Sequence, residues 1–181
     1  MLTLKVPKTE MWNEATQEFT STKKDWVLQL EHSLISLSKW ESKWCKPFFS
    51  KENKTYEETL DYIRCMTLTP NVPDEVYKCL TASNISAIND YIGAPMTATW
   101  FGKDQQVSKS NEQVTSELIY YWMIALNIPF ECQKWHINRL LTLVRVCNIK
   151  NQPPKKMSKR ALMSRNAALN ASRRKRFGTS G

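Results

Sequence analysis

Glycine is scarce in this sequence, and its scarcity argues against several classes of nucleotide enzyme. The four glycines are scattered and form neither a phosphate-cradling loop nor the turn that opens a dinucleotide-binding fold. The acidic pairs Glu57–Glu58 and Asp74–Glu75 lie at predicted helix starts, where favourable interaction with the helix dipole accounts for them. None of these features points to a catalytic group or to a cofactor.

Histidine is almost as scarce, and the cysteines are spread along the chain. Cys132 and His136 are four residues apart, which is the spacing of a metal-ligand pair on a helix, but a zinc site needs three or four ligands. The same spacing suits a Cys–His nucleophile, yet nothing marks an oxyanion site. A packed cysteine beside a hydrogen-bonded histidine is therefore favoured over both, and we predict neither a metal site nor a catalytic residue. Five cysteines without a secretory signal do not predict a disulfide framework.

Long apolar runs are also missing. No run approaches the roughly 20 residues that span a bilayer, and the first residues lack the basic start and apolar stretch of a signal peptide. We therefore expect a cytosolic protein with no membrane partner. Aromatic residues, in contrast, are plentiful: seven Trp, six Tyr and six Phe supply ample core material for a folded domain.

Charge is distributed very unevenly. Residues 152–181 contain no Asp or Glu, whereas residues 1–151 carry equal numbers of basic and acidic side chains, so the net charge of +9 belongs to the tail. A partner that binds through charge is therefore expected to contact the tail and not the body. The basic residues of the tail are Lys155, Lys156, Lys159, Arg160, Arg165, Arg173, Arg174, Lys175 and Arg176.

Hydrophobic periodicity predicts a mainly α fold, a single helical domain with a small N-terminal β element and a basic C-terminal helical tail. The β element covers residues 1–32, the helical core 33–151 and the tail 152–181. Apolar residues alternate with polar ones in Leu2–Val6 and in Trp26–Leu30, which is typical of strands. A hairpin between Met11 and Thr20 completes the predicted sheet.

Capping boxes and prolines place the helices. The Thr55–Glu58 box opens a helix that runs to about Met66, and the similar Ser110–Gln113 box opens another that runs to about Asn127. Further helices are expected at 74–80, 85–92 with Asn84 as cap, and 131–149, with a loop over 95–110. Residues 33–44 suit a helical face but are rich in serine, so their state is ambiguous, and residues 157–176 are expected to be helical when docked and frayed when free. The two longest core helices show apolar stripes: Val114, Leu118, Tyr121, Trp122 and Ala125, and then Trp135, Ile137, Leu140, Leu141, Val144 and Cys147.

Two aromatic segments are candidate protein-binding sites. The first holds Trp40, Trp44, Phe48 and Phe49, and its residues suit either the core or a surface of aromatic anchors, of which core is the more common outcome. The second is the pair Trp100–Phe101 in the predicted loop.

The basic tail admits three interpretations. It is a solvated extension, a salt-sensitive contact to nucleic acid phosphates, or a segment that folds on an acidic protein surface. The tail lacks interleaved aromatics, which weakens a single-strand stacking role. It shows neither helix caps nor a recognition-helix pattern, which weakens base readout.

Distinctive strings carry a resemblance to a known family. They are Leu30–Ser42, Tyr62–Thr67, Pro95–Thr99, segments between Ile119 and Leu141, and the ending with its Met-Ser start, Arg-Asn-Ala-Ala-Leu-Asn centre and final Gly-Thr-Ser-Gly. These strings resemble the tail assembly chaperone family of long-tailed, siphovirus-type bacteriophages, and the likeness spans nearly the whole chain. The resemblance implies a protein that binds the tape measure protein, recruits tail tube subunits and then leaves, and it supplies no catalytic residues.

Three hypotheses follow, in order of preference. The first is a tail assembly chaperone in the host cell cytoplasm, with the tape measure and tail tube proteins as partners and possible self-association. The second is a structural tail or neck component of the virion. The third is a nucleic-acid-binding protein that acts through its basic tail. An enzyme comes last.

Overall fold

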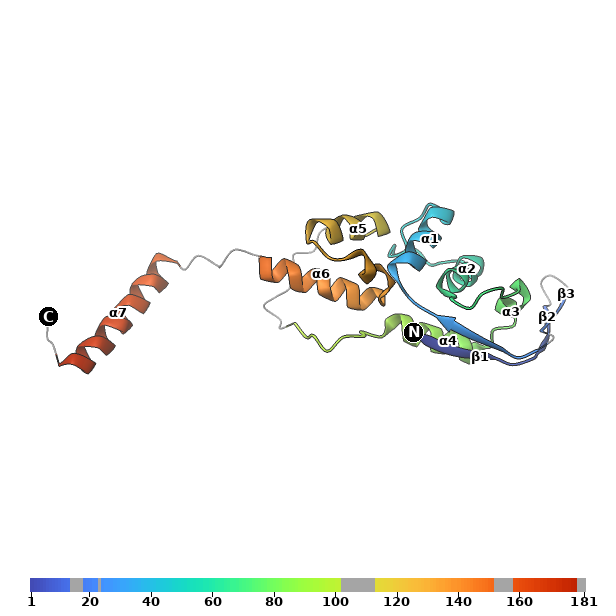
Figure 1. The fold of residues 1–181 in the computed structure, drawn as a ribbon, viewed down its shortest axis with the longest axis horizontal. Helices are drawn as coiled ribbons and strands as arrows, with labels where there is room; N and C mark the ends of the chain where they lie inside the picture. The colour runs from blue at the N-terminus through green and yellow to red at the C-terminus, as the bar shows by residue number, and fades with distance from the viewer. Residues whose placement is uncertain (14–17, 23, 102–112, 152–157, 179–181) are drawn as a thin grey trace. The chain divides into compact units, whose positions relative to one another are not determined.

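The computed structural model describes residues 1–13, 18–22, 24–101, 113–151 and 158–178 (Figure 1). The fold is mainly helical with a small N-terminal β element, as the periodicity predicts. The chain divides into two compact units, Met1–Ile149 and Lys150–Gly181. No helix in the described ranges is long and apolar enough to cross a membrane.

The β element is a hairpin built from nested antiparallel pairs. Strand β1 (Leu2–Val6) pairs with β4 (Trp26–Leu30), and β2 (Glu10–Asn13) pairs with β3 (Glu18–Ser21). Pro7 has no N–H to donate and lies where the first pair of strands ends. One face of β1 and β4 is buried, because the side chains alternate across the pleat. The buried residues are Leu4, Val6, Leu28 and Leu30.

The helical part follows the predicted order. Its elements are α1 (Leu34–Trp44), α2 (Tyr56–Met66), α3 (Asp74–Lys78), α4 (Ala82–Gly93), α5 (Ser116–Ala125), the short 3₁₀ helix η2 (Phe130–Lys134) and α6 (Ile137–Asn151). The predicted Thr55–Glu58 capping box is confirmed: the Glu58 N–H donates to the Thr55 hydroxyl, and the Thr55 N–H donates to the Glu58 carboxylate. The second unit contains α7 (Lys159–Phe177).

Two predicted helix starts are wrong. Helix α4 is capped by Thr81, and Asn84 is the third helical residue, whose side chain accepts the Thr81 N–H. Asn84 instead ties α4 to β1 by donating to the carbonyl of Lys5, and Figure 1 shows α4 running alongside that strand. Helix α5 begins at Ser116 with Thr115 as its cap. Most of the expected box, Ser110–Glu112, lies outside the described residues.

The predicted helix over 131–149 is interrupted. The chain forms η2, leaves the helix at Trp135 and His136, and starts again as α6. His136 forms an isolated antiparallel bridge with Ser33, and the Ile137 N–H donates to the His32 carbonyl at 2.7 Å. This pairing with the start of α1 requires an extended backbone at the break, which helical periodicity alone does not reveal.

The core lies between the hairpin and the helices. Trp40 is fully buried at its centre, with its ring edge-on to Phe48 at 5.3 Å and to Tyr62 at 6.4 Å between ring centroids. The indole N–H donates to the Glu58 carbonyl at 2.8 Å, so this large side chain leaves no polar atom unpaired. The face of α6 that contributes Ile137, Leu140 and Val144 is buried, as predicted.

Candidate functional site

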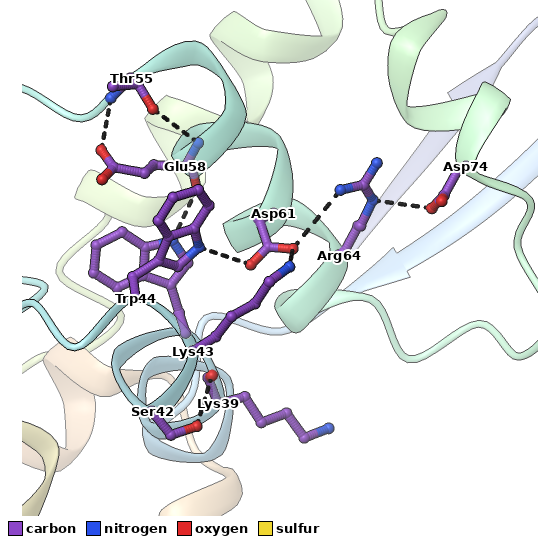
Figure 2. A network of polar contacts seen from close by, with 10 residues as sticks. Lys39, Ser42, Lys43, Trp44, Thr55, Glu58, Asp61, Arg64 and Asp74 are labelled. Carbon is purple, nitrogen blue, oxygen red and sulfur yellow. Dashed lines mark hydrogen bonds and ion pairs between the residues drawn. The ribbon is translucent and has the colours of Figure 1, made fainter.

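Two buried carboxylates of α2, Asp61 and Glu58, join it to α1 and to the segment that follows α1. Figure 2 shows both side chains. One oxygen of Asp61 accepts from the Lys43 ammonium and the other from the Trp44 indole N–H at 2.9 Å. Glu58 accepts from Lys46 at 2.6 Å and from the Thr55 N–H at 2.8 Å. Each carboxylate therefore has a donor on both of its oxygens.

A third buried carboxylate, Glu41, connects three segments of the body. One of its oxygens accepts the Phe48 N–H at 2.7 Å, and the other accepts the Ser116 N–H at 2.7 Å. Ser116 is the first residue of α5, so Glu41 satisfies one of the backbone donors that a helix start leaves without a partner. Its negative charge also lies at the positive end of the α5 dipole.

These contacts keep the α2 carboxylates ionised. Hydrogen bonds from Lys46 and from the Thr55 backbone lower the pKa of Glu58. Burial alone raises the pKa of Asp61, but the bonds from Lys43 and Trp44 and the nearby positive charges outweigh it, so that the pKa is lowered. A general acid needs a raised pKa and access to substrate. The geometry assigns these groups to holding helices together.

The two histidines lie against each other in the core. The rings of His32 and His136 are edge-on, with centroids 5.0 Å apart. Nε2 of His136 donates to the Tyr91 carbonyl at 3.0 Å, and its Nδ1 accepts the Asn138 N–H at 3.3 Å, which defines a neutral ring. Nδ1 of His32 is hydrogen-bonded to the Tyr62 hydroxyl. Burial, followed by repulsion from His136, lowers the pKa of His32 to about 3, and burial also lowers that of His136.

Cys132 and His136 do not share a helical face in the described structure. Cys132 belongs to η2 and His136 to the break that follows it. Both ring nitrogens of His136 are engaged with backbone groups, and burial raises the pKa of the Cys132 thiol, which disfavours the reactive thiolate. Among the described residues, no group of three or more His, Cys, Asp and Glu side chains is placed to hold a metal ion.

The predicted aromatic anchors divide into buried and exposed residues. Trp40 and Phe48 are buried in the core, which is the more common of the two outcomes expected for this segment and removes both residues from the candidate anchor surface. Trp44 is half-buried, and its indole N–H donates a hydrogen bond to Asp61. Phe49 keeps some exposure, and Trp100 is the most accessible of the six at 84%.

The remaining predicted anchor, Phe101, is half-buried and packs against the guanidinium group of Arg145. Its ring lies 4.0 Å from the guanidinium carbon of Arg145 on α6, a cation–π contact. Only Phe49 and Trp100 therefore keep the exposure that an anchor needs.

An apolar surface that the periodicity missed lies on α5 and η2. The predicted α5 stripe is wrong: Ile119 and Met123 are buried, whereas Tyr121 and Ile124 are 63% and 62% exposed. Tyr120 contacts Phe130 of η2 at 6.4 Å between ring centroids, and Phe130 is 53% exposed. We call these four residues, Tyr120, Tyr121, Ile124 and Phe130, the α5–η2 surface. Helix α5 is apolar on nearly every side, so its sequence does not specify which face is outward.

Helix α7 carries the described part of the basic tail. Every residue from Lys159 to Phe177 is exposed. The expectation that this segment lacks caps is wrong: the Ser158 hydroxyl accepts the Ala161 N–H at 3.2 Å, and Gly178 takes the left-handed conformation that ends many helices. Lys155 and Lys156 lie outside the described residues. The seven other predicted basic residues are all on α7: Lys159, Arg160, Arg165, Arg173, Arg174, Lys175 and Arg176.

Comparison of the chain with protein-family models, with curated proteins and with solved structures finds no match.

Proposed function

We propose that this protein is a phage tail assembly chaperone, which binds the tape measure protein, recruits tail tube subunits and performs no catalysis. The α5–η2 surface is the observation that supports the proposal best, because it is an exposed apolar, aromatic area of the body. The resemblance of the strings around Leu30–Ser42 and Ile119–Leu141 supplies the identity of the partners.

The α5–η2 surface has the composition of a binding site for an apolar protein segment. Tyr121 and Ile124 are one helical turn apart and face the same side of α5. Tyrosine and other large aromatic side chains dominate the energetics of protein interfaces, since they bury much area at low entropic cost. A long helical client presents apolar residues at the same spacing and can lie against this surface.

Holding and releasing a client in the host cell cytoplasm requires affinity and no bond chemistry. The buried carboxylates Glu41, Glu58 and Asp61 are engaged within the body by basic side chains, an indole N–H and backbone N–H groups. Exposed Trp100 is available as a further anchor. Self-association through the same apolar surface is compatible with this role, because a second copy competes with the client and keeps the surface covered until the client arrives.

The test is co-expression with the tape measure protein encoded by the same genome. The double variant Tyr121→Ser and Ile124→Ser should lose most of the captured tape measure protein and should leave that protein insoluble. A matched control is Tyr56→Ser with Leu68→Ser, which removes two apolar side chains of similar exposure, 67% and 57%, from other parts of the body. The control should retain capture.

Two outcomes would overturn the proposal. Equal capture by the wild type and the Tyr121/Ile124 variant, with both folded by circular dichroism, would remove the α5–η2 surface from client binding. Detection of stoichiometric amounts of the protein in purified particles would replace the chaperone with a structural tail or neck component, because an assembly chaperone is absent from the finished particle.

A further inference from the structure

Helix α7 is capped at both ends, and within its own unit, Lys150–Gly181, none of its described residues is buried. It has a serine cap at its start and a glycine in the left-handed conformation at its end, yet all 19 of its residues are exposed. An isolated helix of this length is marginal in water, since most helical stability comes from packing an apolar face. A sequence that defines both ends of a helix without giving it a core is typical of a helix that is completed by a partner.

The charge of α7 identifies the chemistry of that partner. The helix carries seven Lys and Arg residues and no Asp or Glu. Arg174, Lys175 and Arg176 interact favourably with the negative end of the helix dipole, but Lys159 and Arg160 stand at the positive end and are unfavourable there. Mutual repulsion and this misplaced pair oppose the free helix. Both costs disappear beside a dense array of negative charges.

The arrangement of the charges distinguishes nucleic acid from an acidic protein. Arg173 to Arg176 are four consecutive residues, which cover a whole helical turn and point in all directions. A helix that docks in a protein groove needs a continuous apolar stripe. Leu162 and Leu169 share a face, but Asn166 lies between them and Met163 points away from them, so α7 has no such stripe. Charge on every side instead suits a groove with phosphates on both walls.

One side of the middle of α7 is slim. Six small side chains lie on this side, and the larger ones lie on the opposite side. The small residues are Ala161, Ser164, Ala167, Ala168, Ala171 and Ser172, and the larger ones are Leu162, Met163, Arg165, Asn166, Leu169 and Asn170. The major groove of B-form DNA is about 12 Å wide and admits one α-helix. Arg160 and Arg173 are roughly 20 Å apart along the axis at 1.5 Å per residue, so the two basic ends can reach phosphates at separate points along the groove.

We infer that α7 binds double-stranded DNA by lying in the major groove, with its basic ends on the phosphates. Asn166, Asn170 and Arg173 share one side of the helix and present amide and guanidinium groups of the kind that pair with base edges. Most of the affinity comes from phosphate contacts, so binding is steeply salt-dependent and only weakly sequence-dependent. This activity is separate from client binding by the α5–η2 surface and stands whether or not the chaperone proposal holds.

The experiment uses the full-length protein and a short random-sequence DNA duplex in a fluorescence anisotropy titration at several salt concentrations. The wild type should bind, and its affinity should fall roughly 10³-fold between 50 and 200 mM salt, as expected for about six phosphate contacts. Arg173→Gln, Arg174→Gln, Lys175→Gln and Arg176→Gln together should reduce the affinity at least tenfold. The matched control, Lys5→Gln, Lys39→Gln, Lys51→Gln and Lys78→Gln, removes the same charge from exposed positions of the body and should bind almost as the wild type.

A second variant tests the helix and not only its charge. Ala168→Pro leaves every charge in place and breaks α7 at its centre, so it should weaken duplex binding severalfold. If Ala168→Pro binds the duplex as tightly as the wild type, α7 acts only as an unstructured polycation, and the assignment of α7 to the major groove is wrong. Three further outcomes would also overturn it. The first is tighter binding to single-stranded DNA, and the second is equal binding to duplex RNA, whose major groove is too deep and narrow for a helix. The third is binding to polyglutamate in preference to the duplex, which would show an acidic polypeptide partner.

Discussion

Mild acidification should destabilise the body, because both histidines are buried and neutral. His32 has its pKa lowered from 6.5 to about 3 by burial and by His136, and burial lowers the pKa of His136 as well. In the unfolded chain each histidine regains a pKa near 6.5. Below that value the unfolded state therefore binds more protons than the folded state, and stability falls as the pH decreases until the folded pKa is reached.

The size of the effect follows from the His32 shift. Between pH 7.5 and pH 5 the linkage relation gives a loss of about 2 kcal/mol for a single group with pKa values of about 6.5 unfolded and about 3 folded. His136 adds a loss of the same sign. The side chains around the pair are Tyr62, Tyr91 and Phe48. The hydrogen bond to the Tyr91 carbonyl and then the charge of Glu31 moderate the lowering of the His136 pKa, whereas the N-terminal amine, which is ion-paired with Glu31 at 3.0 Å, adds to it. The lowered pKa values of Glu58 and Asp61 place their titration below this window.

Urea denaturation at a series of pH values between 5 and 7.5 measures this loss. The free energy of unfolding should decline steadily as the pH falls. The variant His32→Gln can still hydrogen-bond to Tyr62 but does not titrate, so its free energy of unfolding should decline less, by only the part that His136 contributes. A wild-type slope that matches the slope of His32→Gln would refute the assignment of the pH dependence to the buried ring.

Three further substitutions test the packing that positions the body, each by thermal or urea denaturation at pH 7.5. Glu41→Ala should cost roughly 3 kcal/mol, because it leaves the Phe48 and Ser116 N–H groups buried without acceptors; a cost below about 0.5 kcal/mol would mean that water replaces the carboxylate. Trp40→Ala should cost about 3–5 kcal/mol or prevent folding, since it empties the centre of the core. Thr55→Ala should cost about 1 kcal/mol through loss of the α2 cap, and a stability equal to the wild type would show that the cap is replaced by solvent.

The sequence predicted best those elements whose signals are local. The alternation in Leu2–Val6 and Trp26–Leu30 predicted both strands, and the Thr55–Glu58 box predicted the start of α2. These patterns succeed because the signal itself, an alternation of apolar and polar residues or a capping box, lies within a few positions, even though β1 pairs with the distant strand β4.

The misses arose where distant residues decide the structure. The break at His136 is imposed by pairing with Ser33, which is far away in the sequence. For Trp40 the sequence favoured the core without excluding a surface, and the tertiary fold buries it while Trp100 stays exposed. The outward face of α5 could not be chosen from periodicity, since nearly all of its positions are apolar.

The two proposed surfaces depend on opposite driving forces, and salt therefore separates them. Contacts to Tyr121, Ile124 and Phe130 are apolar and are preserved or strengthened by salts such as sulfate. Contacts to α7 are ionic and are lost as salt rises. If the tape measure protein is captured equally at low and high salt while DNA is captured only at low salt, two independent sites are present on one chain. If capture of the tape measure protein also collapses at high salt, the client is held by α7, and the α5–η2 surface is left without a role in client binding.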